Sequence, residues 1–199
     1  MESDEFLPQM RITDAPQDYF DLDAILACAP TVPMKLDERT PPTIFPLFGH
    51  NAPASIGPRG IRVDIPLWMA PAIVEGQLGV AQYPTGYNQN YQSVLNCNPE
   101  STPISDINHY YYTFGSSLCR ILPLDLATPL SASVLNTWVQ RAGGFVSRPL
   151  QGQTKIDGAT QEELVVFQKG VKAKEKFDNW RRDVKVKGSN KRKLAAYNR

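Results

Sequence analysis

The chain has 199 residues, of which 42% are hydrophobic and 21% are charged, and this composition is typical of a folded globular protein rather than a disordered one. The net charge of +1 gives no reason to expect an acidic partner from bulk charge alone. The charge is unevenly spread, because residues 1–23 hold seven acidic side chains and one basic one, whereas residues 160–199 hold twelve basic and five acidic ones.

The first predicted element is a short helix over residues 18–28, which follows an acidic extension at residues 1–17. Asp21 is placed to cap this helix, because its carboxylate can accept hydrogen bonds from the free amide groups of the first turn. Pro30 and Pro33 end the helix. Three side chains form its expected apolar face, namely Leu22, Ile25 and Leu26.

Two strands are predicted next. Residues 43–48 are mostly apolar, but Pro46 favours an edge position for this strand because proline cannot donate to a ladder. Residues 61–65 alternate between apolar and charged side chains, which is the period of a half-buried strand. Pro66 ends the alternation, and the apolar residues after it have helical spacing.

The sequence after Pro66 predicts helices around residues 87–95 and over residues 110–122. A third helix is expected to begin with Thr128 as its N-cap and Pro129 in its first turn. Its apolar stripe consists of Val134, Leu135, Trp138, Val139, Ala142, Phe145 and Val146. Within this helix, the glycines at 143 and 144 are destabilising by about 1 kcal/mol each relative to alanine.

The last predicted helix starts near Thr160, with acidic residues in its first turn and basic residues later, as the helix dipole favours. Its buried side is expected to comprise Leu164, Phe167, Val171, Phe177 and Trp180. Together these elements predict an α+β fold. A small β-rich domain at residues 18–66 precedes a mainly α-helical domain at residues 67–183, and residues 184–199 form a basic flexible tail.

The sequence shows no motif of an active site. It lacks a phosphate-binding Gly-Lys-Ser loop, a nucleophile elbow and a cluster with metal-ligand spacing, so we expect no catalytic residue, cofactor or metal. His109 is best interpreted as a packing or capping residue, because acid–base catalysis needs a positioned partner. An enzyme would need His109 within hydrogen-bonding reach of a carboxylate. No stretch has the ~18 apolar residues of a membrane span, and we expect no membrane partner.

Two kinds of binding remain open. The basic residues near the C-terminus can neutralise phosphates of a nucleic acid, or they can form a solvated tail or a nuclear-import signal. Trp68, Trp138 and Trp180 are each on a predicted helix. They can anchor subunit interfaces or close the protein's own core.

Five segments, in order, resemble subunit 3 of the eukaryotic GINS complex. The matching segments are residues 18–26 (DYFDLDAIL), 63–70 (VDIPLWMA), 112–118 (YTFGSSL), 135–141 (LNTWVQR), and 167–170 (FQKG) with 177–180 (FDNW). The resemblance covers roughly residues 18 to 183 and does not extend to the acidic extension or the basic tail.

The resemblance implies a β-rich B domain followed by a helical A domain, in a chain without catalysis of its own. Its implied partners are three other GINS subunits, the MCM helicase ring and the RecJ-like subunit of the CMG replicative helicase, with DNA contact indirect or weak. The implied location is the nucleus.

On this basis we expect the chain to be a scaffold subunit in DNA replication. The candidates for subunit-interface anchors are Trp138, Phe167, Val171, Phe177 and Trp180. Arg62 and Asp64 are the candidates for contact with the motor ring. The alternative is a small nucleic-acid-binding module that uses the basic C-terminal segment.

Overall fold

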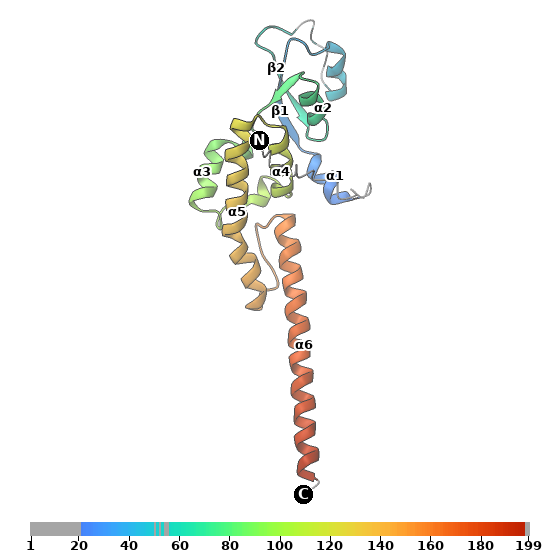
Figure 1. The fold of residues 1–199 in the computed structure, drawn as a ribbon, viewed down its shortest axis with the longest axis vertical. Helices are drawn as coiled ribbons and strands as arrows, with labels where there is room; N and C mark the ends of the chain where they lie inside the picture. The colour runs from blue at the N-terminus through green and yellow to red at the C-terminus, as the bar shows by residue number, and fades with distance from the viewer. Residues whose placement is uncertain (1–20, 50, 52, 54–55, 198–199) are drawn as a thin grey trace, which may run out of the picture.

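The computed structural model describes residues 21–49, 51, 53 and 56–197, with side chains described up to residue 184. A small antiparallel sheet lies at one end of the molecule, helices lie below it, and the last helix projects far beyond both (Figure 1). This mixture of helices with a separate small sheet confirms the predicted α+β class. The acidic extension predicted at residues 1–17 lies outside the described residues.

The first helix, α1, spans Leu22–Cys28 and is capped as predicted. The Asp21 carboxylate accepts hydrogen bonds from the amides of Asp23 at 3.0 Å and Ala24 at 3.3 Å. The predicted apolar face of α1 does not face the core, because Ala27 is the residue that α1 buries. Its three larger apolar side chains, Leu22, Ile25 and Leu26, are exposed.

The sheet has the order β2-β1-β3, with both outer strands antiparallel to the central one. The bounds are Thr31–Leu36 for β1, Ile61–Pro66 for β2 and Gly79–Ala81 for β3. β2 confirms the strand predicted at residues 61–65. The central strand β1 was not predicted, because it contains Pro33. The carbonyl of Pro33 accepts a hydrogen bond from the Gln82 amide at 2.8 Å, so this residue faces the β3 side of the sheet. The missing amide of Pro33 therefore removes only one hydrogen bond, at a position just past the end of β3.

The strand predicted at residues 43–48 is wrong. The segment Pro42–Phe48 is a 3-10 helix, η1, with a proline at its start and Gly49 at its end. Gly49 has a φ of 75°, a left-handed conformation that glycine adopts without steric cost. Phe45 is buried while Leu47 is 68% exposed, as a helical turn allows.

A turn and the short helix α2, Ala70–Glu75, follow Pro66 and lead into β3. The sheet therefore takes strands from both sides of residue 66. One continuous core joins sheet residues such as Met34 and Ile65 to helical residues such as Phe114 and Leu130. The division into domains at residue 66 stays a prediction.

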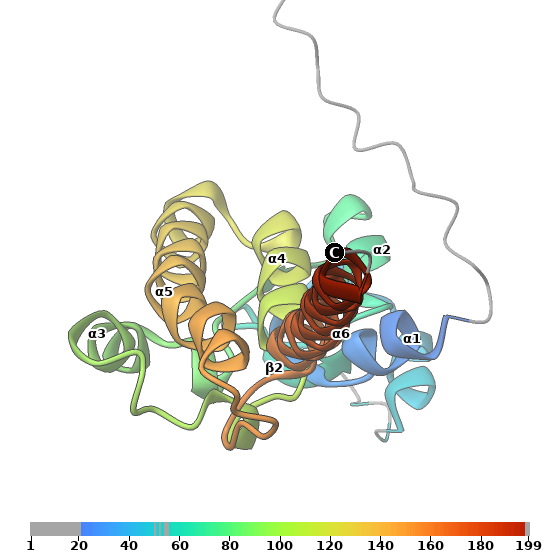
Figure 2. The same cartoon turned by 90° about the horizontal axis from the view of Figure 1, so that it is seen from below.

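The helical part begins with η2 at Thr85–Tyr87, α3 at Gln89–Cys97 and η3 at Ile104–Asp106. Two longer helices, α4 at Tyr111–Ile121 and α5 at Leu124–Leu150, pack side by side (Figure 2). The helices predicted near residues 87–95 and 110–122 are confirmed.

The predicted start of α5 is wrong. The helix begins directly after Pro123, so Thr128 and Pro129 lie inside it rather than at its cap. The Thr128 hydroxyl donates to the carbonyl of Leu124 at 2.8 Å, one turn earlier. Pro129 falls early in the helix, where its missing amide leaves one carbonyl of the first turn without a helical partner.

The last helix, α6, spans Gln161–Tyr197 and starts where predicted. The flexible tail predicted at residues 184–199 is wrong for residues 184–197, which continue α6; residues 198–199 lie outside the described part. Lysine, arginine and alanine are good helix formers, so a helix started upstream propagates through this basic stretch. At 1.5 Å per residue, α6 is about 55 Å long. Within the described residues, no helix has the length and apolar character to cross a membrane.

Candidate interaction surfaces

The first turn of α6 is anchored by a buried carboxylate. Glu163 is fully buried, and its Oε1 accepts hydrogen bonds from the Tyr112 hydroxyl of α4 at 2.7 Å and from Nε of Arg141 in α5 at 2.6 Å. Oε2 accepts from Nη2 of Arg141 at 2.9 Å and from the Thr160 amide at 3.1 Å. The Thr160 hydroxyl accepts from the Glu163 amide at 3.4 Å, which completes a capping box.

Arg141 joins this carboxylate to two loops. Its Nη1 donates to the carbonyls of Pro99 at 2.6 Å and Thr102 at 3.0 Å, and its Nη2 also donates to the carbonyl of Gly158 at 3.3 Å. With the two bonds to Glu163, every N–H of the guanidinium has a partner. A buried ion pair is favourable only when its remaining polar groups are satisfied in this way.

The charges in this network reinforce each other. Burial opposes the charged form of Arg141, but the hydrogen bond and negative charge of Glu163 outweigh it and raise the pKa of the guanidinium. Burial, followed by the hydrogen bond to Glu163, raises the pKa of the Tyr112 hydroxyl. Tyr112 is therefore neutral and donates a hydrogen bond to the carboxylate of Glu163, which forms an ion pair with Arg141.

A second contact connects α6 to the start of α4. Oε1 of Glu162 accepts a hydrogen bond from the Thr113 amide at 2.9 Å, which satisfies a free N–H of the first turn of α4. The carbonyl of His109 accepts from the Gln161 amide at 2.8 Å. The first turn of α6 is thus fixed to both α4 and α5, so the rest of α6 projects in a defined direction.

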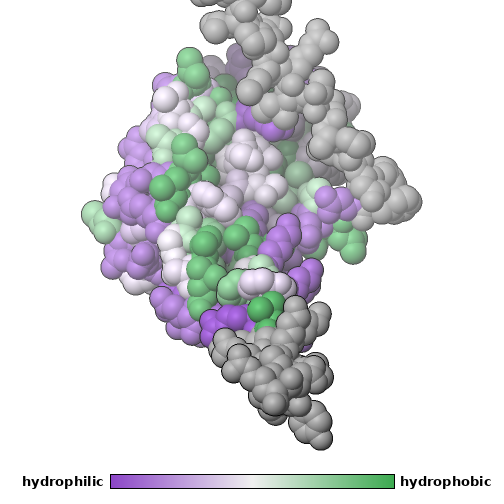
Figure 3. Space-filling view, turned by 60° about the horizontal axis from the view of Figure 1, so that its bottom comes forward, coloured by the Kyte–Doolittle hydropathy of each residue, from purple (hydrophilic) through white to green (hydrophobic). Residues whose placement is uncertain are grey.

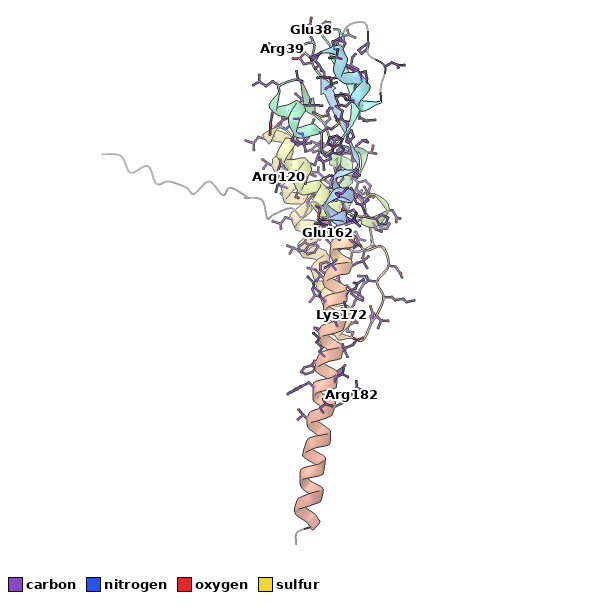
Figure 4. The ribbon with its side chains drawn as sticks, turned by 90° about the vertical axis from the view of Figure 1, so that its right-hand side faces the viewer. Glu38, Arg39, Arg120, Glu162, Lys172 and Arg182 are labelled. Atoms are coloured by element: carbon purple, nitrogen blue, oxygen red, sulfur yellow. The ribbon has the colours of Figure 1, made fainter. Side chains whose placement is uncertain are left out.

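Beyond its first turns and up to residue 184, most side chains of α6 are exposed, and they include two aromatic residues. Phe177 is 54% exposed and Trp180 is 59% exposed, and their ring centroids lie 5.7 Å apart. Basic side chains point outward along the same length of helix, as Lys172 and Arg182 do in Figure 4. A large aromatic pair on a projecting basic helix is an unusual surface for an isolated monomer.

The outer side of α5 is also apolar and exposed. Leu135 is 64% exposed, and Val139 and Val146 are more than half exposed. Beside them, a groove of about 450 Å³ runs between α4 and α5 and is lined by Val134, Leu135 and Trp138. Figure 3, which views the molecule from the α6 side, shows hydrophobic surface exposed between hydrophilic regions.

The predicted interface residues fall into two groups. Phe167 is buried inside the chain, Val171 is half-buried, and Trp138 is half-buried with its ring edge-on to Tyr112 at 4.8 Å. Phe177 and Trp180 are free on the projecting part of α6. Phe167 is therefore not on the surface of the free chain, and it stabilises the docking of α6 within the chain.

The outer side of α5 was missed as a candidate surface, although its signal is in the sequence. Leu135 and Val139 follow Val134 and Trp138 by one position each, so the stripe is too wide for a single buried face. Two rows one position apart predict that one row is exposed.

At the sheet end, Arg62 and Asp64 are both exposed on β2, where the sequence placed them. Trp68 is 65% exposed, which contradicts a role for all three tryptophans in the protein's own core. It borders an apolar groove of about 290 Å³ between η1 and α2, together with Leu47 and Phe48.

His109 is exposed in the turn before α4. In the part of the chain that the structure describes, no group of three or more His, Cys, Asp or Glu side chains is placed to hold a metal ion. A scan of the sequence against models of known protein families finds no match.

Proposed function

We propose that this chain is a non-catalytic scaffold subunit of a GINS heterotetramer, in which it helps to hold the CMG helicase together during DNA replication. The observation that carries the proposal is the amount of apolar side chain exposed on anchored helices. Phe177 and Trp180 on α6, and Leu135 and Val139 on α5, are all more than half exposed. Surfaces of this kind are typical of a subunit of a permanent complex.

The two surfaces have different proposed roles. Phe177 and Trp180 form the primary anchor, because aromatic side chains dominate the free energy of protein association. The buried Glu163–Arg141 pair holds α6 in position before assembly, so little conformational entropy is lost when a sister subunit docks. The groove beside Trp138 accepts an apolar helix face from a second sister subunit.

In this proposal the sheet end of the chain faces the motor ring. Arg62 and Asp64 are the contact candidates, because both are exposed on one strand and carry opposite charges. Such charged contacts act on specificity and association rate more than on affinity. The RecJ-like subunit is a further partner in the same assembly.

The experiment is co-expression of the full-length chain with the three other GINS subunits. The double variant Phe177→Ala and Trp180→Ala is expected to weaken assembly by at least about 30-fold, as loss of a central aromatic anchor does. Its melting temperature as a free chain should change little, because both side chains are exposed. Leu124→Ala, which removes an 81% exposed side chain at the far end of α5, is the matched control.

Normal assembly by the Phe177→Ala and Trp180→Ala variant would exclude α6 as the anchor. Failure of the wild-type chain to join the three subunits would exclude the proposed function itself.

The second candidate is nucleic-acid binding by the basic half of α6. It is favoured by the helical backbone through Tyr197, which spaces the basic residues of the 181–193 segment along one helix rather than along an extended tail. This candidate predicts that deletion of residues 184–199 abolishes DNA binding and that the logarithm of the binding constant falls steeply with the logarithm of salt concentration. A flat salt response would exclude it.

A further inference from the structure

β2 is an edge strand of the sheet, and its outer side is unpaired within the described residues. The sheet order places β1 on one side of β2 and no strand on the other. An edge strand presents free N–H and C=O groups that can pair with another extended chain. The question is which groups face outward and which chain they fit.

The hydrogen bonds of the neighbouring residues settle which groups face outward. The Leu67 amide donates to the carbonyl of Pro30 on the β1 side, and the Gln82 amide donates to the carbonyl of Pro33 on the β3 side. Backbone direction alternates along a strand, so the odd-numbered residues of β2 pair with β1. The N–H and C=O groups of Arg62 and Asp64 therefore point outward, and none of them bonds to a described backbone group.

Both ends of this free edge are closed. The Gly60 amide donates to the carbonyl of Gly57 at 2.9 Å, and the carbonyl of Pro66 accepts from the Met69 amide at 3.0 Å. Pro66 also has no N–H to offer. The outward backbone groups of this edge are thus those of Arg62 and Asp64, on either side of Val63, which is a short and sharply defined docking site.

The order of charges along this edge is complementary to the same order read in the opposite direction. Arg62 and Asp64 are both exposed, and neither forms an ion pair with a described residue. An antiparallel partner strand needs an acidic residue opposite Arg62 and a basic residue opposite Asp64. Read in the opposite direction, β2 itself supplies this pattern.

We propose that β2 pairs with β2 of a second copy of this chain about a two-fold axis at Val63. Arg62 of each copy then lies opposite Asp64 of the other. Their outward backbone groups exchange hydrogen bonds, and their side chains form two ion pairs on the solvent face. The two sheets of three strands become one continuous sheet across the dimer.

The register follows from the charges. Outward residues pair only with outward residues, so a shift by one pair sets Arg62 against Arg62 or Asp64 against Asp64, and like charges directly opposite are destabilising. Charged side chains on an edge strand oppose nonspecific pairing between strands. Here they disfavour the shifted registers and favour the one register that gives a closed dimer. The contact is smaller than the ~1,200 Å² of standard complexes, so we expect a weak dimer that depends on concentration.

The dimer does not depend on the proposed replication function. It uses the strand that the proposal assigns to the motor ring, so one chain can make either contact but not both. Pairing between copies is therefore expected in chains that are not engaged with the ring.

The test is sedimentation velocity of the purified full-length chain from about 10 to about 500 µM, the range suited to a small interface. The chain has a mass of 22.2 kDa, and the weight-average mass should rise toward twice this value. Arg62→Glu alone and Asp64→Lys alone should each remain monomeric, because each sets like charges opposite one another. An equimolar mixture of the two variants should dimerise, and so should the chain that carries both substitutions.

Arg59→Glu is the matched control, because it makes the same charge change just before β2 and should leave the dimer intact. A constant monomer mass for the wild-type chain overturns the proposal. Dimers of either single variant overturn it as well, because the interface then lies elsewhere. Growth beyond twice the monomer mass also overturns it, because a two-fold contact is closed.

Discussion

Replacement of Glu163 by glutamine tests whether the buried pair at the base of α6 holds the helix in place. Glu163→Gln keeps the shape of the side chain but removes the negative charge that faces Arg141 at 2.6 Å. Arg141 is 8% exposed, so the variant leaves a buried guanidinium without a counter-charge within the described residues. Breaking a buried ion pair by removing one partner typically costs about 3–5 kcal/mol.

For a chain of this size, 1 kcal/mol corresponds to about 2–4 °C in melting temperature, so Glu163→Gln should lower it by about 6–20 °C. Differential scanning calorimetry measures this change. Amide hydrogen exchange should show the largest loss of protection in the first turns of α6, because the capping box and the ion pair share the same carboxylate.

Asp178→Asn is the matched control on the same helix. Asp178 accepts a hydrogen bond from Lys174 at 2.6 Å, but the two side chains are 30% (Lys174) and 42% (Asp178) exposed to solvent. The control makes the same carboxylate-to-amide change, and because solvent screens this pair, the melting temperature should change much less than with Glu163→Gln. Equal effects of Glu163→Gln and Asp178→Asn would refute the reasoning, because burial would then not matter.

A double-mutant cycle with Arg141→Met separates the pair from its other contacts. Once the guanidinium is absent, Glu163→Gln no longer leaves a buried charge uncompensated. The two substitutions together should therefore cost less than the sum of their separate effects, by about 1–3 kcal/mol. Strict additivity would show that the two side chains are not coupled.

Two further predictions concern the core and the backbone. Burial raises the pKa of Tyr87 and Tyr111 above the ordinary 10.0, so their contribution to stability is complete below pH 10 and is lost progressively above it. Above pH 10 the free energy of unfolding, measured by urea titration, should fall by up to about 1.4 kcal/mol per pH unit for each tyrosine. An unchanged free energy of unfolding between pH 9 and 11 would contradict this. Gly143→Ala should stabilise α5 by about 1 kcal/mol, because the new methyl group meets open space. Gly60→Ala should destabilise the fold, because φ is +68° and the new Cβ would lie 2.5 Å from the Leu36 carbonyl oxygen. A higher melting temperature for Gly60→Ala than for Gly143→Ala would contradict this reasoning.

Local signals in the sequence were sufficient for several elements. The cap at Asp21 and the start of α6 after Thr160 depend on side chains within three residues of the helix end. The alternation at residues 61–65 likewise predicted β2. These features are readable because the interacting groups are neighbours along the chain.

The central strand β1 could not be predicted in this way. Pro33 argues locally against a strand, and only the position of Gln82 in space shows that its carbonyl is paired. The opposite error occurred at η1, where the sequence predicted a strand and the structure has a helix. An apolar run with proline at 42 and 46 can form a 3-10 helix as well as a strand. For β1 a distant contact, not local propensity, decided the outcome.

The anchor of α6 was also invisible in the sequence. Arg141 and Glu163 are separated by a loop, and their partners Pro99 and Tyr112 come from two further segments. Nothing in the spacing of these residues predicts that they meet. The separation of Phe167 from Trp180 was predictable, however, because thirteen residues at ~100° each place them about 140° apart around a helix.

The measurement that tests the central claim most directly is the mass of the complex formed when the full-length chain is co-expressed with the three other GINS subunits. Native mass spectrometry should show one assembly with a single copy of each of the four chains, and it should be lost on Phe177→Ala with Trp180→Ala. A chain that folds cooperatively alone and never joins the other three would contradict the account.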